Sequence, residues 1–261
     1  MKKVFLCGAE TLAGEALSKQ LLAETDSELV LVSVSRDLVP VERCEVIYVD
    51  DWDAKQIRKL CIAARPDVVV DCVMENNPEQ CEENRLRVQK INVDLFKNLA
   101  QASKICESFF VGFSSEYIYD GKKGPYDEVS PINAVGYFAK SCLAAENVCK
   151  TELKDYAVFR TTDIYGHSEY SQNDIISNIL MENIKGNNQV FHNNSFSNPI
   201  LNEDVAKTVC YAIERRRSGF YNLGGSEYLD MASFVELLGQ SFKLNMDLIQ
   251  FEALPNELRR G

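Results

Sequence analysis

The stretch VFLCGAETLAG, residues 4–14, combines a short apolar run, a turn that contains glycine, and the start of a helical pattern. Apolar residues recur every three or four positions up to residue 23, so we expect a strand over residues 4–7 and a helix over residues 12–23. A turn between them leaves N–H groups free at the positive end of the helix, where a pyrophosphate binds in dinucleotide sites. The stretch therefore predicts a dinucleotide site at Gly8, Thr11, Leu12 and Gly14.

The rest of the first 160 residues alternates in the same way. Apolar runs at residues 29–34, 45–49, 67–70, 108–113 and 156–160 are separated by helical patterns at 55–64, 83–102 and 137–150. Runs that are apolar throughout indicate strands buried on both faces, and their alternation with helices indicates a parallel sheet. We therefore predict an α/β fold, a Rossmann-type doubly wound parallel sheet, with residues 1–160 as a dinucleotide-binding domain.

The pattern loosens after residue 160. Helices are predicted at residues 174–185, 202–216 and 231–242 and a strand at 219–223, while the asparagine-rich stretch 186–198 is predicted to be a loop. We expect residues 161–261 to form a small, discontinuous α/β lobe for the substrate, interleaved with the first domain.

Composition excludes several classes of function. The net charge of −11 argues against nucleic acid and anionic membranes as partners. No apolar run approaches the ~20 residues that span a bilayer, and residues 4–7 are better interpreted as a strand than as a signal peptide. The nine cysteines include no C-x-x-C pair, which favours free thiols in the cytoplasm over disulfides or a metal site.

Residues at the ends of the next strands could complete the dinucleotide site. Arg36 follows the second strand, where an arginine can accommodate a 2′-phosphate, so NADP(H) is favoured over NAD(H); a solvated surface arginine is the alternative. Asp50 is placed to meet the adenine or to cap the next helix. Cys72 and Val73 follow the fourth strand and should lie beneath the cofactor.

A second pair of stretches predicts chemistry on a carbonyl or alcohol group. Ser115 closes an apolar strand within FSSEYIYDG, residues 113–121, and Tyr137 and Lys140 stand within PINAVGYFAK, residues 131–140. In a hydride-transfer site a serine holds the substrate oxygen, a tyrosine supplies the proton, and a lysine lowers the pKa of that tyrosine. We therefore name Ser115, Tyr137 and Lys140 as candidate catalytic residues, although Tyr137 precedes the lysine by three positions where such sites use four.

These motifs together resemble the extended short-chain dehydrogenase/reductases, in particular the dTDP-4-dehydrorhamnose reductase type. SSEYIYDG at 114–121 is similar to that family's S-T-D-Y-V-F-D-G, and FRTTDIYG at 159–166 to its R-T-S-W-V-Y-G. The resemblance implies an NADP(H)-dependent reductase of a 4-keto sugar nucleotide. It also implies that Lys140 binds the cofactor, and it leaves a homodimer open.

The chain departs from the family pattern at two places. Thr11 replaces the middle glycine of G-x-x-G-x-x-G, and the family's Y-G-x-[ST]-K has tyrosine and glycine exchanged at Gly136 and Tyr137. Moving a helical side chain by one position rotates it by about 100°. Two alternatives therefore stay open: a non-catalytic dinucleotide- or partner-binding module, like the regulatory β subunit of methionine adenosyltransferase that resembles these reductases, and a sugar-nucleotide epimerase or dehydratase.

Overall fold

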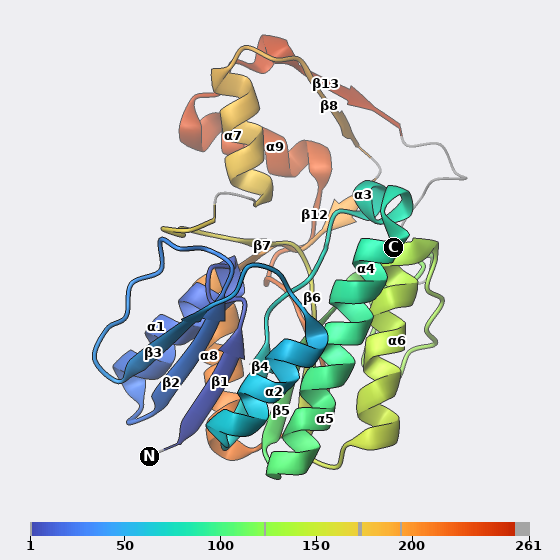
Figure 1. Ribbon diagram of the computed structural model, residues 1–261. Helices are drawn as coiled ribbons and strands as arrows, with labels where there is room; N and C mark the ends of the chain where they lie inside the picture. Colours follow the sequence, from blue (N-terminus) through green and yellow to red (C-terminus); the bar gives the residue numbers. More distant parts are fainter. Residues whose placement is uncertain (1, 123, 172–173, 194, 254–261) are drawn as a thin grey trace.

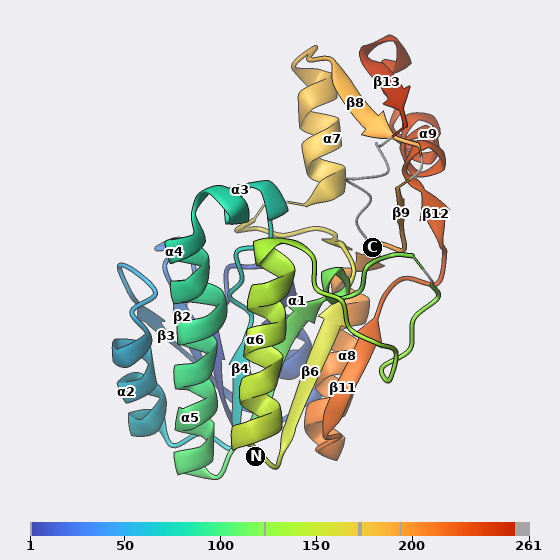
Figure 2. The same ribbon diagram turned by 90° about the vertical axis from the view of Figure 1, so that its right-hand side faces the viewer.

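The protein consists of a layered α/β body and a small lobe above it (Figure 1). A computed structural model describes residues 2–122, 124–171, 174–193 and 195–253. The body carries the large sheet, and the lobe lies over the carboxyl ends of its strands (Figures 1 and 2).

The sheet has seven strands in the order β11-β6-β5-β4-β1-β2-β3, and every pairing is parallel. The strands are β1 (Lys3–Cys7), β2 (Glu28–Ser33), β3 (Cys44–Tyr48), β4 (Val68–Asp71), β5 (Phe109–Ser115), β6 (Tyr156–Thr161) and β11 (Gly219–Leu223). The chain reverses its direction of winding between β1 and β4, which is where doubly wound sheets bind their ligands. The predicted fold class is confirmed.

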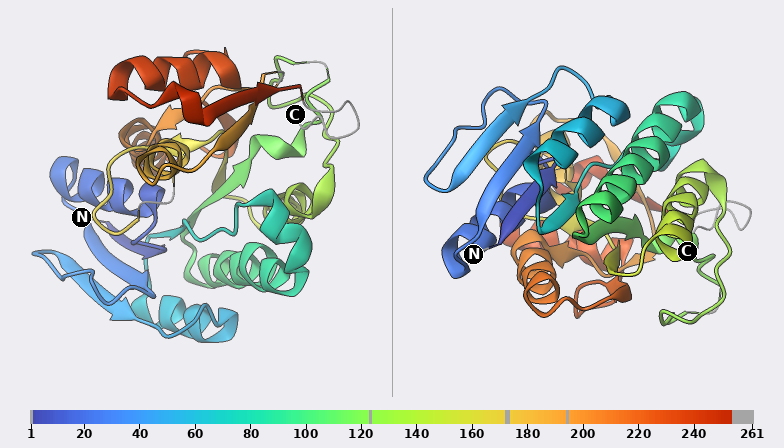
Figure 3. Two further views of the ribbon diagram at one scale, coloured as in Figure 1. Left: turned by 90° about the horizontal axis from the view of Figure 1, so that it is seen from above. Right: turned by 60° about the horizontal axis from the view of Figure 1, so that its bottom comes forward.

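Helices cover both faces of this sheet (Figure 3). On one face lie α1 (Leu12–Glu24) and α8 (Asn202–Arg215); on the other lie α2 (Ala54–Ala64), α5 (Phe96–Cys106) and α6 (Gly136–Glu152). Alternate residues of each central strand enter the two cores, as Leu6 and Val70 do on the α1 side and Phe5 and Val69 on the α5 side. Strands buried on both faces explain the continuous apolar runs of the sequence.

The helical region predicted at 83–102 is less regular than its apolar pattern indicates. It contains α3 (Pro78–Glu83), α4 (Arg85–Val88), a π-helical segment at Gln89–Leu95, and then α5. The wider turn places the amide of Asn92 where it bonds the backbone of Glu75, with distances of 2.8 and 3.0 Å, and the hydroxyl of Ser141 at 3.0 Å. These bonds fix the segment after β4 against α6.

The lobe packs around its own small core. Its helices are α7 (Ile175–Ile184) and α9 (Met231–Phe242), and β8 (Gln189–His192) pairs in parallel with β13 (Ile249–Glu252). β9 (Phe196–Ser197) pairs with β12 (Leu229–Asp230). β7 (Ile164–Tyr165) pairs with β10 (Ile200–Leu201), and this pair packs against the core of the body through Ile164 and Ile200. The prediction of a loop across residues 186–198 is therefore wrong, because two strands form there with partners far along the chain.

The cysteines of the protein are free thiols, and most of them lie in its interior. All nine cysteines are free, and seven of them are buried. Burial raises the pKa of several of these thiols, Cys7 and Cys142 among them, so they stay protonated at neutral pH. Across the described ranges, no helix has the length and apolar character needed to cross a bilayer.

Candidate functional site

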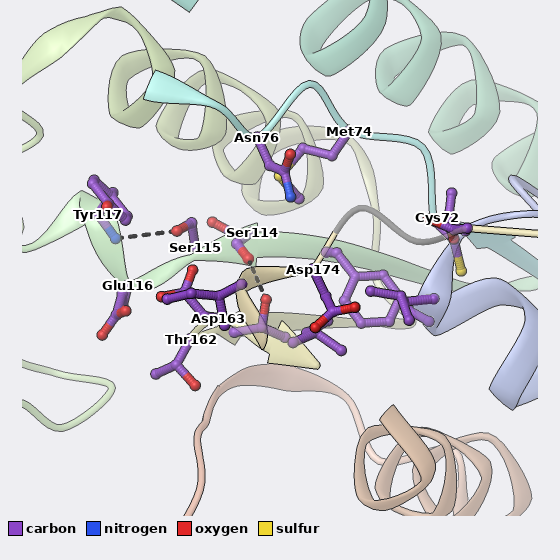
Figure 4. A pocket seen from close by; sticks show the side chains of 18 of the residues that line it. Cys72, Met74, Asn76, Ser114, Ser115, Glu116, Tyr117, Thr162, Asp163 and Asp174 are labelled. Atoms are coloured by element: carbon purple, nitrogen blue, oxygen red, sulfur yellow. Dashed lines mark hydrogen bonds between the residues drawn. The ribbon is translucent and has the colours of Figure 1, made fainter. Parts of the chain in front are cut away.

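A cavity of about 340 Å³ opens at the carboxyl ends of the sheet strands, between the body and α7. Figure 4 shows the side chains that converge on it. They come from the β1–α1 turn, the segments after β4, β5 and β6, the start of α6, and the start of α7. The cavity therefore lies at the reversal point of the sheet, where the topology predicts a ligand.

The β1–α1 turn is built for close approach to a ligand. Gly8 has φ +82°, and a Cβ there would lie 2.9 Å from Val73 Cγ2. A Cβ on Gly14 would lie 2.0 Å from the carbonyl oxygen of Gly8. Thr11 fits because its backbone is extended, with φ −77°, and its hydroxyl caps α1: it accepts from the Gly14 N–H at 3.0 Å and donates to the Gly8 carbonyl at 2.8 Å. Thr11 thus holds the turn that a glycine would otherwise form.

The first turn of α1 faces the cavity. Leu12 and Ala13 line it, and no bond within the described part of the chain uses their backbone N–H groups. Such N–H groups at a helix start bind anions. Glu10 lies beside them; its Oε1 accepts a 3.4 Å bond from the Val34 N–H, and its buried Oε2 has no partner among the described residues. The turn therefore combines anion-binding N–H groups with one carboxylate.

The other predicted cofactor residues divide between the cavity and the surface. Cys72 lines the cavity, while Val73 packs beneath the turn against Gly8. Arg36 and Asp50 lie outside the cavity, exposed, and form an ion pair of 2.6 Å. The Arg36 guanidinium, which was expected to meet a 2′-phosphate, is therefore paired with the Asp50 carboxylate.

The hydroxyl groups at the end of β5 and β6 are in place. Ser115 lines the cavity, and its oxygen accepts a 3.3 Å bond from the Tyr117 N–H (Figure 4). That bond uses a lone pair, so the hydroxyl can still donate to a ligand. Thr161 and Thr162 also line the cavity, and Thr161 donates to the Ser114 carbonyl at 3.4 Å.

Tyr137 and Lys140 lie elsewhere on α6. The Tyr137 N–H donates to Glu82 Oε1 at 2.6 Å, and the Arg85 guanidinium lies over its ring, 5.3 Å from the centroid. Lys140 is exposed. The Tyr137 N–H and the Arg85 guanidinium keep the pKa of Glu82 below its ordinary value. The Tyr137 ring therefore packs against Arg85 of α4, and neither Tyr137 nor Lys140 is among the described residues that line the cavity.

Phe138 is the residue of α6 that reaches the cavity. It is 4% exposed, and its ring meets that of Tyr117 edge-on with centroids 5.6 Å apart. Cys142, four residues later on the same helix face, is buried beside it. Phe138 is therefore the α6 side chain at the cavity, while the ring of Tyr137, one position earlier, lies under the Arg85 guanidinium.

A buried ion pair determines which side of α6 is turned toward the sheet. Arg160 on β6 is 3% exposed, and its Nε and Nη2 bond both oxygens of Glu146, at 2.9 and 2.8 Å. The Ser114 hydroxyl donates to the same carboxylate at 2.9 Å. Because Glu146 must face the sheet, Cys142 and Phe138, about one and two turns earlier, face it as well.

Carboxylates that motif reading did not single out line the far side of the cavity. Glu116 follows β5, Asp163 follows β6, and Asp174 begins α7. Burial raises the pKa of Glu116 to about 8, with a further contribution from Asp163, whose own pKa burial also raises. No lysine or arginine is among the described lining residues, and no group in the described part of the chain has the ligands for a metal ion.

The chain matches a known protein family and is similar to proteins that carry a name. A family model described as "RmlD substrate binding domain" matches residues 1–260. Methionine adenosyltransferase 2 subunit beta of Xenopus tropicalis is 25% identical over 251 residues, which cover 93% of this chain and 73% of that protein.

Two solved structures of similar fold complete the comparison. A dTDP-4-dehydrorhamnose reductase of Bacillus anthracis in complex with NADP is 18% identical with a TM-score of 0.80, and 98% of this chain and 85% of that one are covered. WbmH of Bordetella bronchiseptica in complex with NAD+ is 19% identical with a TM-score of 0.85, covering 100% of this chain and 88% of that one.

Proposed function

The chain belongs to the RmlD substrate-binding domain family, as its motifs predicted, and from this premise we propose that it binds a nicotinamide dinucleotide without reducing a substrate. The observation that carries the proposal is the phenyl ring of Phe138, the α6 side chain that lines the cavity. Phe138 has no proton to give to a substrate oxygen, and Cys142, buried in the same cluster, carries no charge that could lower a neighbouring pKa.

The residues around the turn fit a dinucleotide. The Gly8 and Gly14 cradle would admit the pyrophosphate, and the N–H groups of Leu12 and Ala13 would bind it. When bound, the dinucleotide supplies a hydride donor or acceptor. Ser115 would hold a polar group of the ligand beside the nicotinamide end. The similar structures that contain NADP and NAD+ support this assignment at the level of the group bound.

The reductase of a 4-keto sugar nucleotide is the second candidate. Ser115 and the hydroxyl-rich ends of β5 and β6 favour it, because they can hold a sugar. It would require a proton donor other than Tyr137, whose ring lies under Arg85, and the same requirement applies to an epimerase or dehydratase. The arrangement on α6 therefore favours binding over turnover.

A binding protein of this kind acts through a partner. The relatives named as subunit beta of methionine adenosyltransferase 2 are, by that name, parts of a larger enzyme, and the match covers 93% of this chain. We therefore favour a regulatory module over a free-standing enzyme, acting in the cytoplasm in accordance with its nine free thiols.

Calorimetric titration with NAD+, NADH, NADP+ and NADPH tests the proposal. We expect saturable binding of at least one form. The Tyr137→Phe and Lys140→Ala variants should bind it within about twofold of the parent, because both side chains lie outside the cavity. Absence of binding of all four forms at millimolar concentration would contradict the proposal.

Arg36 is the residue expected to set any preference for a 2′-phosphate. Replacing it with alanine should lower the affinity for NADP+ several-fold and leave that for NAD+ unchanged. Asp50→Asn should have the opposite effect, because it frees the guanidinium from its 2.6 Å ion pair. Titrations of both variants at fixed ionic strength measure the two ratios; equal effects on NAD+ and NADP+ would remove Arg36 from the site.

A further inference from the structure

The acidic residues that line the cavity bear on which redox form of a dinucleotide binds there, a choice that the fold alone does not determine. We propose that the site binds the oxidised, cationic nicotinamide in preference to the reduced, neutral one, and so reports the redox state of the dinucleotide pool. This inference rests on the proposed dinucleotide binding and adds to it which form is recognised.

The topology determines which end of a dinucleotide meets the carboxylates. The ligand of a doubly wound sheet crosses the reversal point between β1 and β4, with one mononucleotide half on each side. The adenosine half belongs to β1, β2 and β3, where Arg36 stands. The nicotinamide half therefore extends over β4, β5 and β6, whose ends carry Cys72, Ser115, Glu116 and Asp163.

Asp174, at the start of α7, has a carboxylate oxygen that is buried at the cavity without a hydrogen-bond partner among the described residues. It is 4% exposed, and its side chain points into the cavity (Figure 4). Its Oδ1 accepts from the N–H groups of Ile176 and Ser177, at 3.0 and 3.1 Å, and caps α7. Its Oδ2 is buried and has no hydrogen-bond partner in the part of the chain that the structure describes. A buried carboxylate oxygen without a partner is costly, and a nearby positive charge removes that cost.

The surrounding groups reinforce the same sign of charge. Glu10 faces the cavity from the β1–α1 turn, Asp163 from the end of β6 and Asp174 from α7, while Glu116 at the end of β5 adds its charge only as the pH rises through its pKa of about 8. No cationic side chain balances them among the described lining residues. Oxidised nicotinamide carries one positive charge on its ring, and reduced nicotinamide carries none. The cavity therefore attracts the first and offers the second no compensation for displacing water.

Calorimetry on the whole chain tests the preference. At pH 7 we expect NAD+ to bind at least about tenfold more tightly than NADH. Asp174→Asn removes the charge and keeps the helix cap, since asparagine caps as well as aspartate, and should bring the ratio down about fivefold or more. Asp163→Asn should act in the same direction. The exposed Glu203→Gln on α8 changes net charge equally and should leave the ratio unchanged.

Dependence on pH provides a second readout. Glu116, with its pKa of about 8, is largely protonated at pH 7; burial raises this pKa most, and the neighbouring Asp163 carboxylate adds to the rise. Raising the pH through 8 adds negative charge to the cavity, so the ratio of NAD+ to NADH affinity should rise between pH 6.5 and 9. Asp163→Asn should shift this rise to lower pH, because the carboxylate that raises the pKa of Glu116 is gone.

The outcomes separate the two proposals. If neither form binds, dinucleotide binding itself fails. If both bind with equal affinity, or NADH binds more tightly, the dinucleotide site stands and the charge selection is overturned. If NAD+ is preferred but Asp174→Asn keeps the ratio of the parent, the preference does not come from these carboxylates, and the inference is overturned as well.

Discussion

Gly14→Ala is expected to abolish measurable dinucleotide binding and to destabilise the fold by about 1–3 kcal/mol. The added Cβ would stand 2.0 Å from the carbonyl oxygen of Gly8, a backbone atom that cannot move without opening the turn. Moving it would also break the Thr11 hydroxyl bonds to Gly8 and Gly14, which hold the start of α1. Chemical unfolding measures the first effect and calorimetric titration the second.

Gly239→Ala on α9 is the matched control. There the new Cβ meets the sulfur of Met246 at 2.7 Å, near the end of a flexible side chain in the lobe. Its binding should equal that of the parent. If Gly14→Ala bound the dinucleotide as well as Gly239→Ala does, the turn would not be the pyrophosphate site.

Glu146→Gln is expected to cost about 3–5 kcal/mol of unfolding free energy, because it leaves the buried Arg160 without a counter-charge. Both residues are almost fully buried, and the pair is bidentate with bonds of 2.9 and 2.8 Å. The remaining bonds of the guanidinium, to the Tyr119 hydroxyl at 2.7 Å and the Glu128 carbonyl at 3.2 Å, are to neutral groups. Urea unfolding followed by circular dichroism measures the loss.

Glu152→Gln, at the end of the same helix, serves as the control for Glu146→Gln. Its side chain accepts a 3.3 Å bond from Gln101, and glutamine keeps an acceptor there. The control should unfold within about 0.5 kcal/mol of the parent. A Glu146→Gln protein that unfolds like the control would mean that Arg160 finds another anion or reaches water.

The sheet could be predicted from the sequence because its evidence is local. Strands such as β2 and β5 contain runs of apolar residues, LVLV in β2 and FFV in β5, and the turn from Gly8 to Gly14 has its spacing within seven residues. The strand β8 could not be predicted in this way, because it pairs with β13, some 60 residues later, and its four residues stand within a polar, asparagine-rich stretch of the sequence.

The candidate site was predictable only in part, for a related reason. The predicted residues that line the cavity lie at the end of a strand or in the turn after it; they are Thr11, Leu12, Cys72 and Ser115. The side of α6 that faces the cavity is instead set by the distant Glu146–Arg160 pair. Tyr137 and Lys140 have the residue types that the chemistry needs, but residue type does not determine the phase of a helix. The carboxylates after β5 and β6 gather only when the strands lie side by side.

The most direct test of binding without turnover uses a mixture of the reduced dinucleotide, an equimolar amount of the protein and a dTDP-4-keto-6-deoxy sugar. The nicotinamide fluorescence reports binding, and the nicotinamide absorbance reports oxidation in the same cuvette. We predict that the fluorescence changes saturably while the absorbance stays constant, because Phe138 supplies no proton. A fall in absorbance in proportion to the added sugar would contradict this and establish a reductase whose acid lies outside α6.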